Sequence, residues 1–227
     1  MKKYVQLIIT IVNFLAIATL IALTVPAIVP IHFGITGQAD SWASKWVYLI
    51  FAFIPILFEI SYQLYARNHE RLNAHNHPYE RRVVIVLEYI FLIINWGFLA
   101  LINVGATRVS PEKLALFTAL ILGSMLIIMC NIYGKIKQNR YFGVRTKATL
   151  ADERIWNLTN RMAGYIGFAT GILLVIWGIV NYYFNIASPT ISLIILLSVT
   201  MAAAAAAPYF VSNYYAKKLI QIGRAHV

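Results

Sequence analysis

The sequence predicts an all-α, polytopic integral membrane protein with six transmembrane helices arranged as three hairpins and both termini in the cytoplasm. Three observations predict this fold class. Apolar residues make up 60% of the 227 residues and charged residues 12%, against about half and about a quarter in soluble proteins. Six apolar stretches are long enough to cross a bilayer, and the basic residues fall almost entirely in alternate loops.

The composition excludes several classes of protein. A mean hydropathy of +0.71 leaves too little polar surface to cover a water-soluble globule, so neither a soluble enzyme nor a disordered chain is expected. The single cysteine, Cys130, cannot pair within the chain, which excludes a disulfide scaffold.

The predicted spans follow from length, because a helix that crosses lipid needs about 20 apolar residues. They are Tyr4–Val29, Trp46–Tyr65, Val83–Asn103, Leu114–Tyr133, Met162–Tyr183 and Thr190–Tyr209. Most of their ends carry Tyr or Trp, which favour the headgroup level. The first stretch is longer than the roughly 7–15 residues of a signal-peptide core, so we expect a retained helix.

The distribution of positive charge predicts the orientation. Sixteen of the 19 Lys and Arg residues lie in the N-terminal segment, the second and fourth loops and the C-terminal segment, and only Lys45, Arg108 and Lys113 lie on the other side. Basic loops stay in the cytoplasm. The net charge of +11 is therefore a topology signal that also favours anionic lipid, and no direct contact with nucleic acid is expected.

We divide the chain into four parts on this pattern. Residues 1–66 form an N-terminal hairpin module with an extracellular loop, and residues 67–111 form a cytoplasmic loop and the third helix. Residues 112–221 form the C-terminal region. Residues 222–227 match a common sequencing adapter read in frame, so we expect an artefact there and exclude these residues from any site.

The first outer loop permits two interpretations. Pro26 and Pro30 end the first helix, and Gly34 and Gly37 allow turns. The loop is either a plain connection with Phe33 and Trp42 at the interface, or a recognition loop whose polar contacts are His32, Asp40 and Lys45.

The second loop contains three of the five histidines, at positions 69, 75 and 77. Histidines this close together could ligate a transition metal, but their spacing matches no closed zinc pattern. A solvated polar loop explains them equally well, so we expect no metal site.

Two acids lie inside the predicted spans, Glu59 and Glu88, at similar depth from the cytoplasmic end. In antiparallel neighbouring helices two such carboxylates could share a proton, and an intramembrane acid is by default a functional-site hypothesis. Alternatively, each reaches the inner interface and meets Arg, Tyr62 or Gln63.

The fourth loop is the segment richest in polar patterns. Thr149 and Asp152 approximate a capping box, and the following pattern predicts a short helix on the inner leaflet that leads into the fifth span. Arg140 and Arg145, on either side of Gly143, could bind an anion. A plain positive-inside loop would explain the charges alone. In the fifth span, Gly167 and Gly171 predict a flat face for close helix packing.

Several residues of the fourth loop closely resemble the signature of the SdpI-type immunity protein family: Asn139, Arg140, Phe142, Gly143, Arg145, Thr146, Thr149, Trp156 and Arg161. Val144 stands where the family usually has Ile, and Lys147-Ala148 where Pro is frequent. Residues 112–221 are thus an SdpI-like region. In the first loop, His32, Gly37 and Lys45 are similar to a small N-terminal module often joined to this domain.

The resemblance implies a bacterial inner-membrane protein that gives immunity to a secreted, membrane-active peptide toxin. Some family members also signal by recruiting a cytoplasmic transcriptional repressor, and the matching residues are candidates for binding or coupling. The expected partners are the lipid bilayer, the toxin, a repressor and a second copy of the chain.

No catalytic residue or cofactor is implied by the resemblance, so we expect no enzyme; H-E-x-x-H, G-x-S-x-G and P-loop motifs are also absent. The alternative function is a small proton-coupled transporter that uses Glu59 and Glu88.

Overall fold

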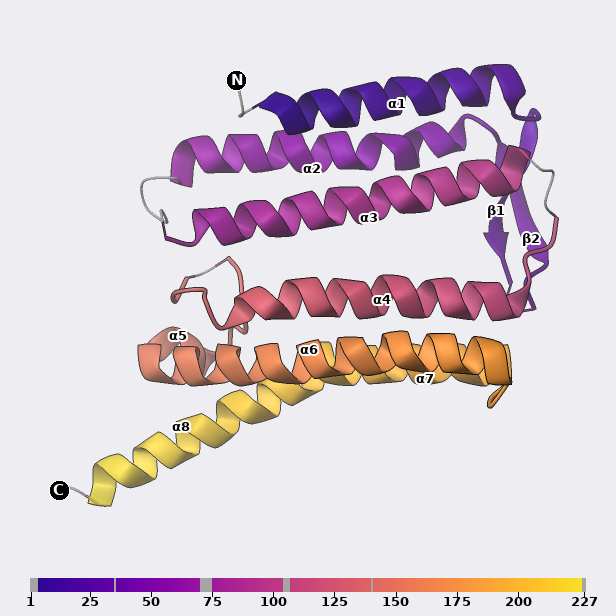
Figure 1. The fold of residues 1–227 in the computed structure, drawn as a ribbon. Helices are drawn as coiled ribbons and strands as arrows, with labels where there is room; N and C mark the ends of the chain where they lie inside the picture. The colour runs from indigo at the N-terminus through magenta and orange to yellow at the C-terminus, as the bar shows by residue number, and fades with distance from the viewer. Residues whose placement is uncertain (1–3, 35, 70–74, 104–106, 140, 226–227) are drawn as a thin grey trace. The chain divides into compact units, whose positions relative to one another are not determined.

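The computed structural model describes residues 4–34, 36–69, 75–103, 107–139 and 141–225, with the side chains at 68–69 and 220–225 left aside. Figure 1 shows the elements in chain order. They are α1 (Val5–Thr24), β1 (Ile28–Phe33), β2 (Ala39–Ser44), α2 (Val47–His69), α3 (His77–Asn103), α4 (Pro111–Tyr133), α5 (Lys147–Ala151), α6 (Glu153–Phe184), α7 (Pro189–Met201), the π-helical turn η2 (Ala202–Ala206) and α8 (Ala207–Ala225).

Within the described residues, six helical stretches are long and apolar enough to cross a membrane, which confirms the predicted fold class. They are Val5–Thr24, Val47–Arg67, His77–Asn103, Pro111–Tyr133, Glu153–Phe184 and Pro189–Leu219. The last combines α7, η2 and most of α8. The cytoplasmic placement of the termini stays a prediction.

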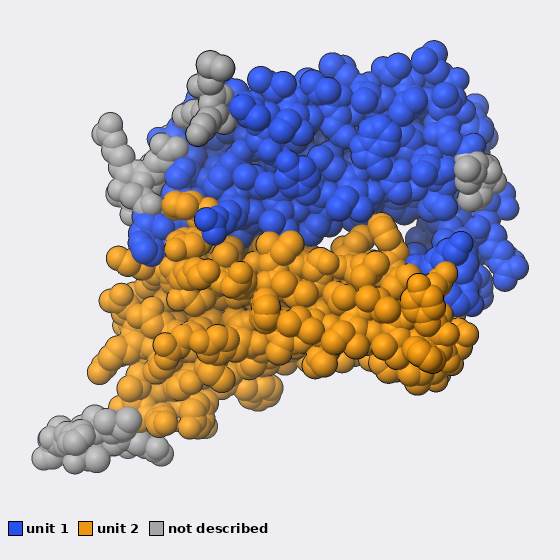
Figure 2. Space-filling view, viewed as in Figure 1, with its two compact units in different colours: residues 1–77, 81–114 blue, residues 78–80, 115–227 orange. Residues whose placement is uncertain are grey.

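The chain forms two compact units, coloured in Figure 2. Unit 1 comprises residues 1–77 and 81–114, and unit 2 comprises residues 78–80 and 115–227. Each is described by itself below. The four-part division made from the sequence stays a prediction.

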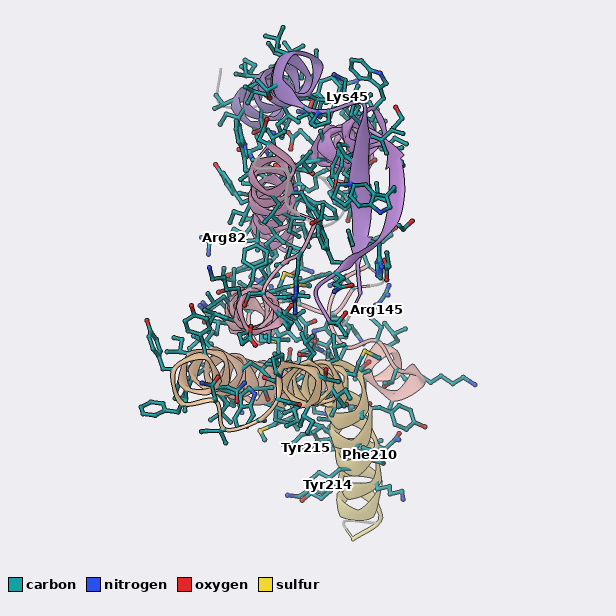
Figure 3. The ribbon with its side chains drawn as sticks, turned by 90° about the vertical axis from the view of Figure 1, so that its right-hand side faces the viewer. Lys45, Arg82, Arg145, Phe210, Tyr214 and Tyr215 are labelled. Atoms are coloured by element: carbon teal, nitrogen blue, oxygen red, sulfur yellow. The ribbon has the colours of Figure 1, made fainter. Side chains whose placement is uncertain are left out.

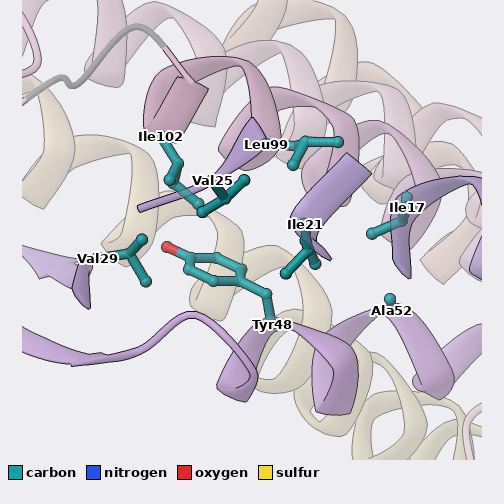
Figure 4. Packing of buried hydrophobic residues seen from close by; sticks show 8 residues of the cluster. All are labelled: Ile17, Ile21, Val25, Val29, Tyr48, Ala52, Leu99 and Ile102. Carbon is teal, nitrogen blue, oxygen red and sulfur yellow. The ribbon is translucent and has the colours of Figure 1, made fainter. Parts of the chain in front are cut away.

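In unit 1, α1, α2 and α3 run alongside one another, with the two strands at one end (Figure 1). Their side chains converge on one apolar cluster, shown in Figure 4: Ile17, Ile21, Val25, Val29, Tyr48, Ala52, Leu99 and Ile102. The Tyr48 hydroxyl donates a hydrogen bond to the carbonyl oxygen of Pro30. This bond satisfies the one polar atom of the cluster and fixes β1 against α2.

The first outer loop is an antiparallel β-hairpin, which the sequence analysis did not predict. The predicted first span reached Val29, but the helix ends at Thr24 and Ile28–Phe33 forms β1. Pro26 and Pro30 cannot continue a helix, and the β-branched residues between and after them favour an extended chain. The apolar run of a span therefore continues directly into a strand, and hydropathy alone could not separate them.

In unit 2, α4 and α6 pack with almost no space between their backbones. A Cβ atom at Gly171 would lie 2.6 Å from the carbonyl oxygen of Gly123, and one at Gly167 would lie 2.2 Å from the Sγ atom of Cys130. Only glycine fits at such distances. The close packing expected for Gly167 and Gly171 is thus realised between α6 and α4.

Helix α6 is continuous from Glu153 to Phe184, so the separate surface helix predicted before the fifth span is wrong. Only the five-residue α5 precedes it. The residues expected to lie on that surface helix instead form the first two turns of α6, whose buried face begins with Ile155 and Trp156.

The last span is interrupted where Pro208 follows a run of alanines. Pro208 has no N–H to donate, and the preceding turn widens into η2, in which the N–H of Ala207 bonds to the carbonyl of Ala202. Beyond this point α8 departs from the direction of α7 (Figure 1).

Candidate functional site

Most of the predicted site residues lie in the loop between α4 and α6, which we call the α4–α6 loop (residues 134–152). Trp156, at the start of α6, is fully buried beneath it. Its indole Nε1 donates to the carbonyl oxygen of Ile136 at 2.7 Å, and Gln138 Nε2 donates to that of Thr149 at 2.6 Å. The first bond anchors the start of the loop to α6, and the second joins the two halves of the loop to each other.

Asn139 organises a tight turn within this loop. Its Oδ1 accepts from the backbone N–H groups of Tyr141 and Phe142, both at 2.8 Å. Its Nδ2 donates to the carbonyls of Lys137 and Phe142. The ring of Phe142 packs edge-on against Tyr133, with centroids 5.7 Å apart. Asn139 and Phe142 thus shape the loop.

Gly143 and Asn160 fit together as a pair. Gly143 has φ +104°, and a Cβ there would lie 2.7 Å from Asn160 Oδ1. That oxygen accepts from the N–H of Val144 at 2.8 Å, while Asn160 Nδ2 donates to the carbonyl of Trp156. Asn160 was not among the predicted binding residues, although it belongs to the segment that resembles the family signature. Its position one helical turn after Trp156 was the available signal.

A capping box begins α5, but not at the predicted residues. Thr146 is the N-cap: its Oγ1 accepts from the N–H of Thr149, and the N–H of Thr146 donates to Thr149 Oγ1 at 2.8 Å. The predicted pair of Thr149 and Asp152 is wrong, because Thr149 is the N3 residue of a box whose N-cap is Thr146. Thr146 Oγ1 also lies 2.5 Å from Ser212 Oγ, which bonds the loop to α8.

Asp152 instead caps α6. Its Oδ1 accepts from the N–H of Arg154 at 2.7 Å, and its Oδ2 from the Arg154 guanidinium at 3.1 Å. The side-chain hydrogen bond from Arg154 holds the pKa of Asp152 below its usual range.

The basic residues of this segment project outward. Arg145, Lys147, Arg154 and Arg161 are all exposed, and Figure 3 labels Arg145, which directly precedes the capped start of α5. The anion site predicted around Gly143 also involves Arg140, which lies outside the described residues. The loop therefore presents cations on a scaffold of buried hydrogen bonds.

Comparison with known proteins gives two matches. Residues 135–212 match the SdpI/YfhL protein family, and residues 8–56 match a domain of unknown function, DUF1648. The chain has the SdpI-type architecture. It is therefore a multi-pass membrane protein of the immunity type. No curated protein and no solved structure matches the chain.

The β-hairpin of this SdpI-type chain lies within the DUF1648 match. His32 Nδ1 and Asp40 Oδ1 are 2.6 Å apart across the two strands, and both side chains are more than half exposed. Gly37 has φ +75° and its carbonyl accepts from the N–H of Val109 at 2.7 Å; a Cβ there would collide with Val109. The hairpin tip is thereby tied to the segment before α4.

Lys45 has a different environment from the one expected. Its Nζ donates to the carbonyls of Ala22 and Val25, at 3.0 and 3.1 Å, where the end of α1 leaves carbonyls without helical partners. Lys45, labelled in Figure 3, thus caps α1 and joins α1 to the hairpin. His32 and Asp40 stay the exposed polar pair.

Glu59 and Glu88 lie close together in unit 1, both fully buried. Glu59 accepts two hydrogen bonds from the Arg81 guanidinium, at 2.5 and 3.2 Å, and one from Gln63 at 2.8 Å. Glu59 thus meets Arg and Gln63, as the second interpretation held. The guanidinium also lies 5.0 Å from the centroid of the Tyr62 ring.

Glu88 differs from Glu59 in its partners. Among the residues that the structure describes, neither of its carboxyl oxygens has a hydrogen-bond partner, and the nearby Gln6 amide nitrogen has none either. The guanidinium of Arg81 therefore bonds to Glu59, and Glu88 is left the less satisfied of the two buried acids.

The histidines of the second loop are only partly described. His77 stacks on Tyr62 with ring centroids 5.6 Å apart, while the side chain of His69 lies outside the described residues. Among the residues whose side chains are described, no three His, Cys, Asp or Glu residues are grouped as a metal site.

Proposed function

We propose that this chain is a non-enzymatic immunity protein of the bacterial inner membrane that protects its host against a secreted, membrane-active peptide toxin. The observation that carries the proposal is the SdpI/YfhL match over residues 135–212, whose motif residues are bonded into one structure in unit 2. No cofactor is needed for this function.

We assign toxin contact to the β-hairpin of unit 1. An exposed His32–Asp40 pair stands there beside exposed apolar side chains, with Trp42 at 49% and Ile28 at 64% exposure. Below the hairpin, a cavity of about 240 Å³ is lined mostly by aromatic side chains of α2 and α3, including Phe51, Phe91 and Phe98. Such a surface suits an apolar peptide that also carries polar groups.

We assign partner binding to the exposed cations of the α4–α6 loop. By the positive-inside rule, a loop with so many exposed cations faces the cytoplasm, and both termini then lie on the same side. A cytoplasmic transcriptional repressor would then meet Arg145 and its neighbours. Signalling of this kind requires two conformations with different affinity for the toxin.

The test is survival of a toxin-sensitive bacterium that expresses the chain during exposure to purified membrane-active peptides. We expect the wild-type chain to raise survival, and Arg145→Ala or His32→Ala to remove protection at equal membrane insertion. Lys217→Ala, which removes an exposed charge of α8 outside both the hairpin and the α4–α6 loop, serves as the control. If the chain protected against none of the peptides in the panel, the proposal would be contradicted.

The orientation has its own test. A reporter active only in the cytoplasm, fused after Leu150, should be active, and one fused after Asp40 should be silent. The opposite pattern would invert the map and exchange the roles of the hairpin and the α4–α6 loop.

A second candidate function, a proton-coupled transporter, is supported by Glu88. This acid is buried, and neither of its oxygens has a hydrogen-bond partner within the described part of the chain. It predicts pH-dependent uptake or efflux in proteoliposomes that Glu88→Gln or Glu59→Gln abolishes. Flux that is unchanged in both variants would eliminate this candidate.

A further inference from the structure

Unit 2 contains a cavity of about 430 Å³ between the end of α4 and the first half of α6. We call it the α4–α6 groove. Its lining residues are Cys130, Asn131, Gly134, Lys135, Arg161, Gly164, Tyr165 and Phe168. A volume of this size is typical of a small-molecule site.

Glycine leaves the floor of the groove open. Gly134 and Gly164 carry no side chains. A Cβ at Gly164 would lie 2.8 Å from the carbonyl oxygen of Cys130, whereas one at Gly134 would make an ordinary contact with Arg161 Cα at 3.5 Å. The two helices therefore approach closely while the space above their backbones stays free.

One end of the groove is cationic. Arg161 and Lys135 are both exposed there, one from each side. Within the part of the chain that the structure describes, no carboxylate forms an ion pair with Arg161. Its guanidinium can therefore make paired hydrogen bonds to the oxygens of an anion.

The other end is apolar and lies deeper in the span. Phe168 follows Arg161 by seven residues, two helical turns on the same face, which places it about 10 Å further along α6. Tyr165 lies between them. The groove thus changes from charged to aromatic along the direction in which the helix enters the apolar part of the span.

We propose that the α4–α6 groove binds one anionic phospholipid, with its phosphate between Arg161 and Lys135 and an acyl chain along Tyr165 and Phe168. The order of charge and apolar surface matches that of a lipid from headgroup to tail. Basic pockets between transmembrane helices are known to select anionic headgroups. The groove uses none of the hairpin residues to which we assign toxin contact, and its lipid binding is measured without toxin or repressor, so the test does not depend on the proposed function.

The experiment is native mass spectrometry of the full chain, purified in detergent and titrated with phosphatidylglycerol or with phosphatidylcholine of the same acyl chains. We expect the wild-type chain to retain one phosphatidylglycerol in clear preference to phosphatidylcholine. Arg161→Gln and Lys135→Gln should each weaken that binding about fivefold. Arg161→Lys should retain most of it.

Two further variants separate a site from general electrostatics. Lys147→Gln removes an exposed cation of α5 that does not line the groove, and should leave binding unchanged. Gly134→Leu adds bulk inside the groove without removing charge, and should weaken binding. Thermal unfolding of each variant checks that the fold is retained, and is expected to change little because these side chains are exposed.

Three results would overturn the proposal. Equal retention of the two lipids would show no headgroup selection. Equal weakening by Lys147→Gln and Arg161→Gln would show attraction by net charge alone. Arg161-dependent binding of an apolar peptide with a free carboxylate, without any lipid binding, would make the groove a peptide site.

Discussion

The buried acid Glu59 of unit 1 and the buried polar residues beneath the α4–α6 loop of unit 2 bond to different kinds of partner. In unit 1, the buried acid Glu59 is bonded to the side chains of Arg81 and Gln63. In unit 2, Trp156 and Asn160 are bonded mainly to the backbone of the α4–α6 loop. When one partner of an oppositely charged pair is removed, the other partner remains as an uncompensated buried charge. When a side chain that bonds to a loop is removed, the loop is free to open.

The two units also differ in how their helices approach one another. The core of unit 1 is filled by large side chains around Tyr48. In unit 2, glycine on α6 allows backbone contact with α4. Substitutions should therefore destabilise the two units by different mechanisms. The expected loss of stability decreases from Gly171→Leu to Asp152→Asn.

Gly171→Leu should have the largest effect, because a Cβ there would meet the carbonyl oxygen of Gly123 and the amide of Ile127, both backbone atoms. We expect the free energy of unfolding to fall by more than about 3 kcal/mol, which is at the upper end of the range for overpacked sites. The measurement is the yield of monodisperse protein after detergent extraction. Ala169→Leu, on the exposed face of α6, should extract normally. Normal yield of both would show that the close packing is not required.

Arg81→Gln should come next, because it leaves Glu59 buried without its cation. Breaking a buried ion pair costs about 3–5 kcal/mol, and the midpoint of thermal unfolding in detergent should fall accordingly. Arg82→Gln, which removes the exposed neighbouring charge labelled in Figure 3, should have little effect.

The same site offers a second comparison. Glu59→Gln in the Arg81→Gln background should recover part of the lost stability, since the buried charge is then removed. Glu88→Gln should not lower the midpoint, because neither oxygen of Glu88 has a hydrogen bond to lose. A large loss from Glu88→Gln would show that Glu88 is the more firmly bonded acid.

Asn160→Ala should have an intermediate and local effect. It removes the acceptor for the N–H of Val144 and the bond to the carbonyl of Trp156, at a cost of about 1–2 kcal/mol. We expect limited proteolysis within residues 135–151 to become several times faster, while the rest of unit 2 stays resistant. Asn157→Ala, exposed on the same helix, is the control; equal cleavage rates would refute the anchoring role.

The smallest effect should be a pH dependence from Asp152. Its pKa is lower in the folded chain than in the unfolded chain because Arg154 bonds to the carboxylate. The resulting stabilisation is present above the unfolded pKa of about 4 and is lost as the pH falls through the folded pKa. The difference in melting midpoint between wild type and Asp152→Asn should therefore shrink on acidification below about pH 4. If the difference in melting midpoint grew below about pH 4, the predicted lowering of the pKa of Asp152 on folding would be contradicted.

The sequence was sufficient to predict the spans and the segment that contains the α4–α6 loop, because both depend on local pattern. Hydropathy over about 20 residues specifies a crossing helix. The glycine spacing in the fifth span also predicted close packing, although not that α4 was the partner.

The features that sequence reasoning missed depend on where elements start and on tertiary contacts. The third span was predicted from Val83, yet α3 begins at His77 and therefore carries Arg81 on the helix, in reach of Glu59. The β-hairpin was missed because its first strand is as apolar as the span before it. Lys45 was a candidate recognition contact in one of the two interpretations of the loop, because nothing local shows that it caps a helix more than 20 residues earlier.

The central claim is that this chain protects a membrane from a peptide that damages it. The most direct measurement is the membrane potential of a sensitive bacterium, followed with a voltage-sensitive dye while membrane-depolarising peptides are added. The account predicts that cells expressing the chain keep their potential at peptide concentrations that depolarise cells carrying an empty vector. Identical depolarisation curves at verified membrane expression, for every peptide tested, would contradict it.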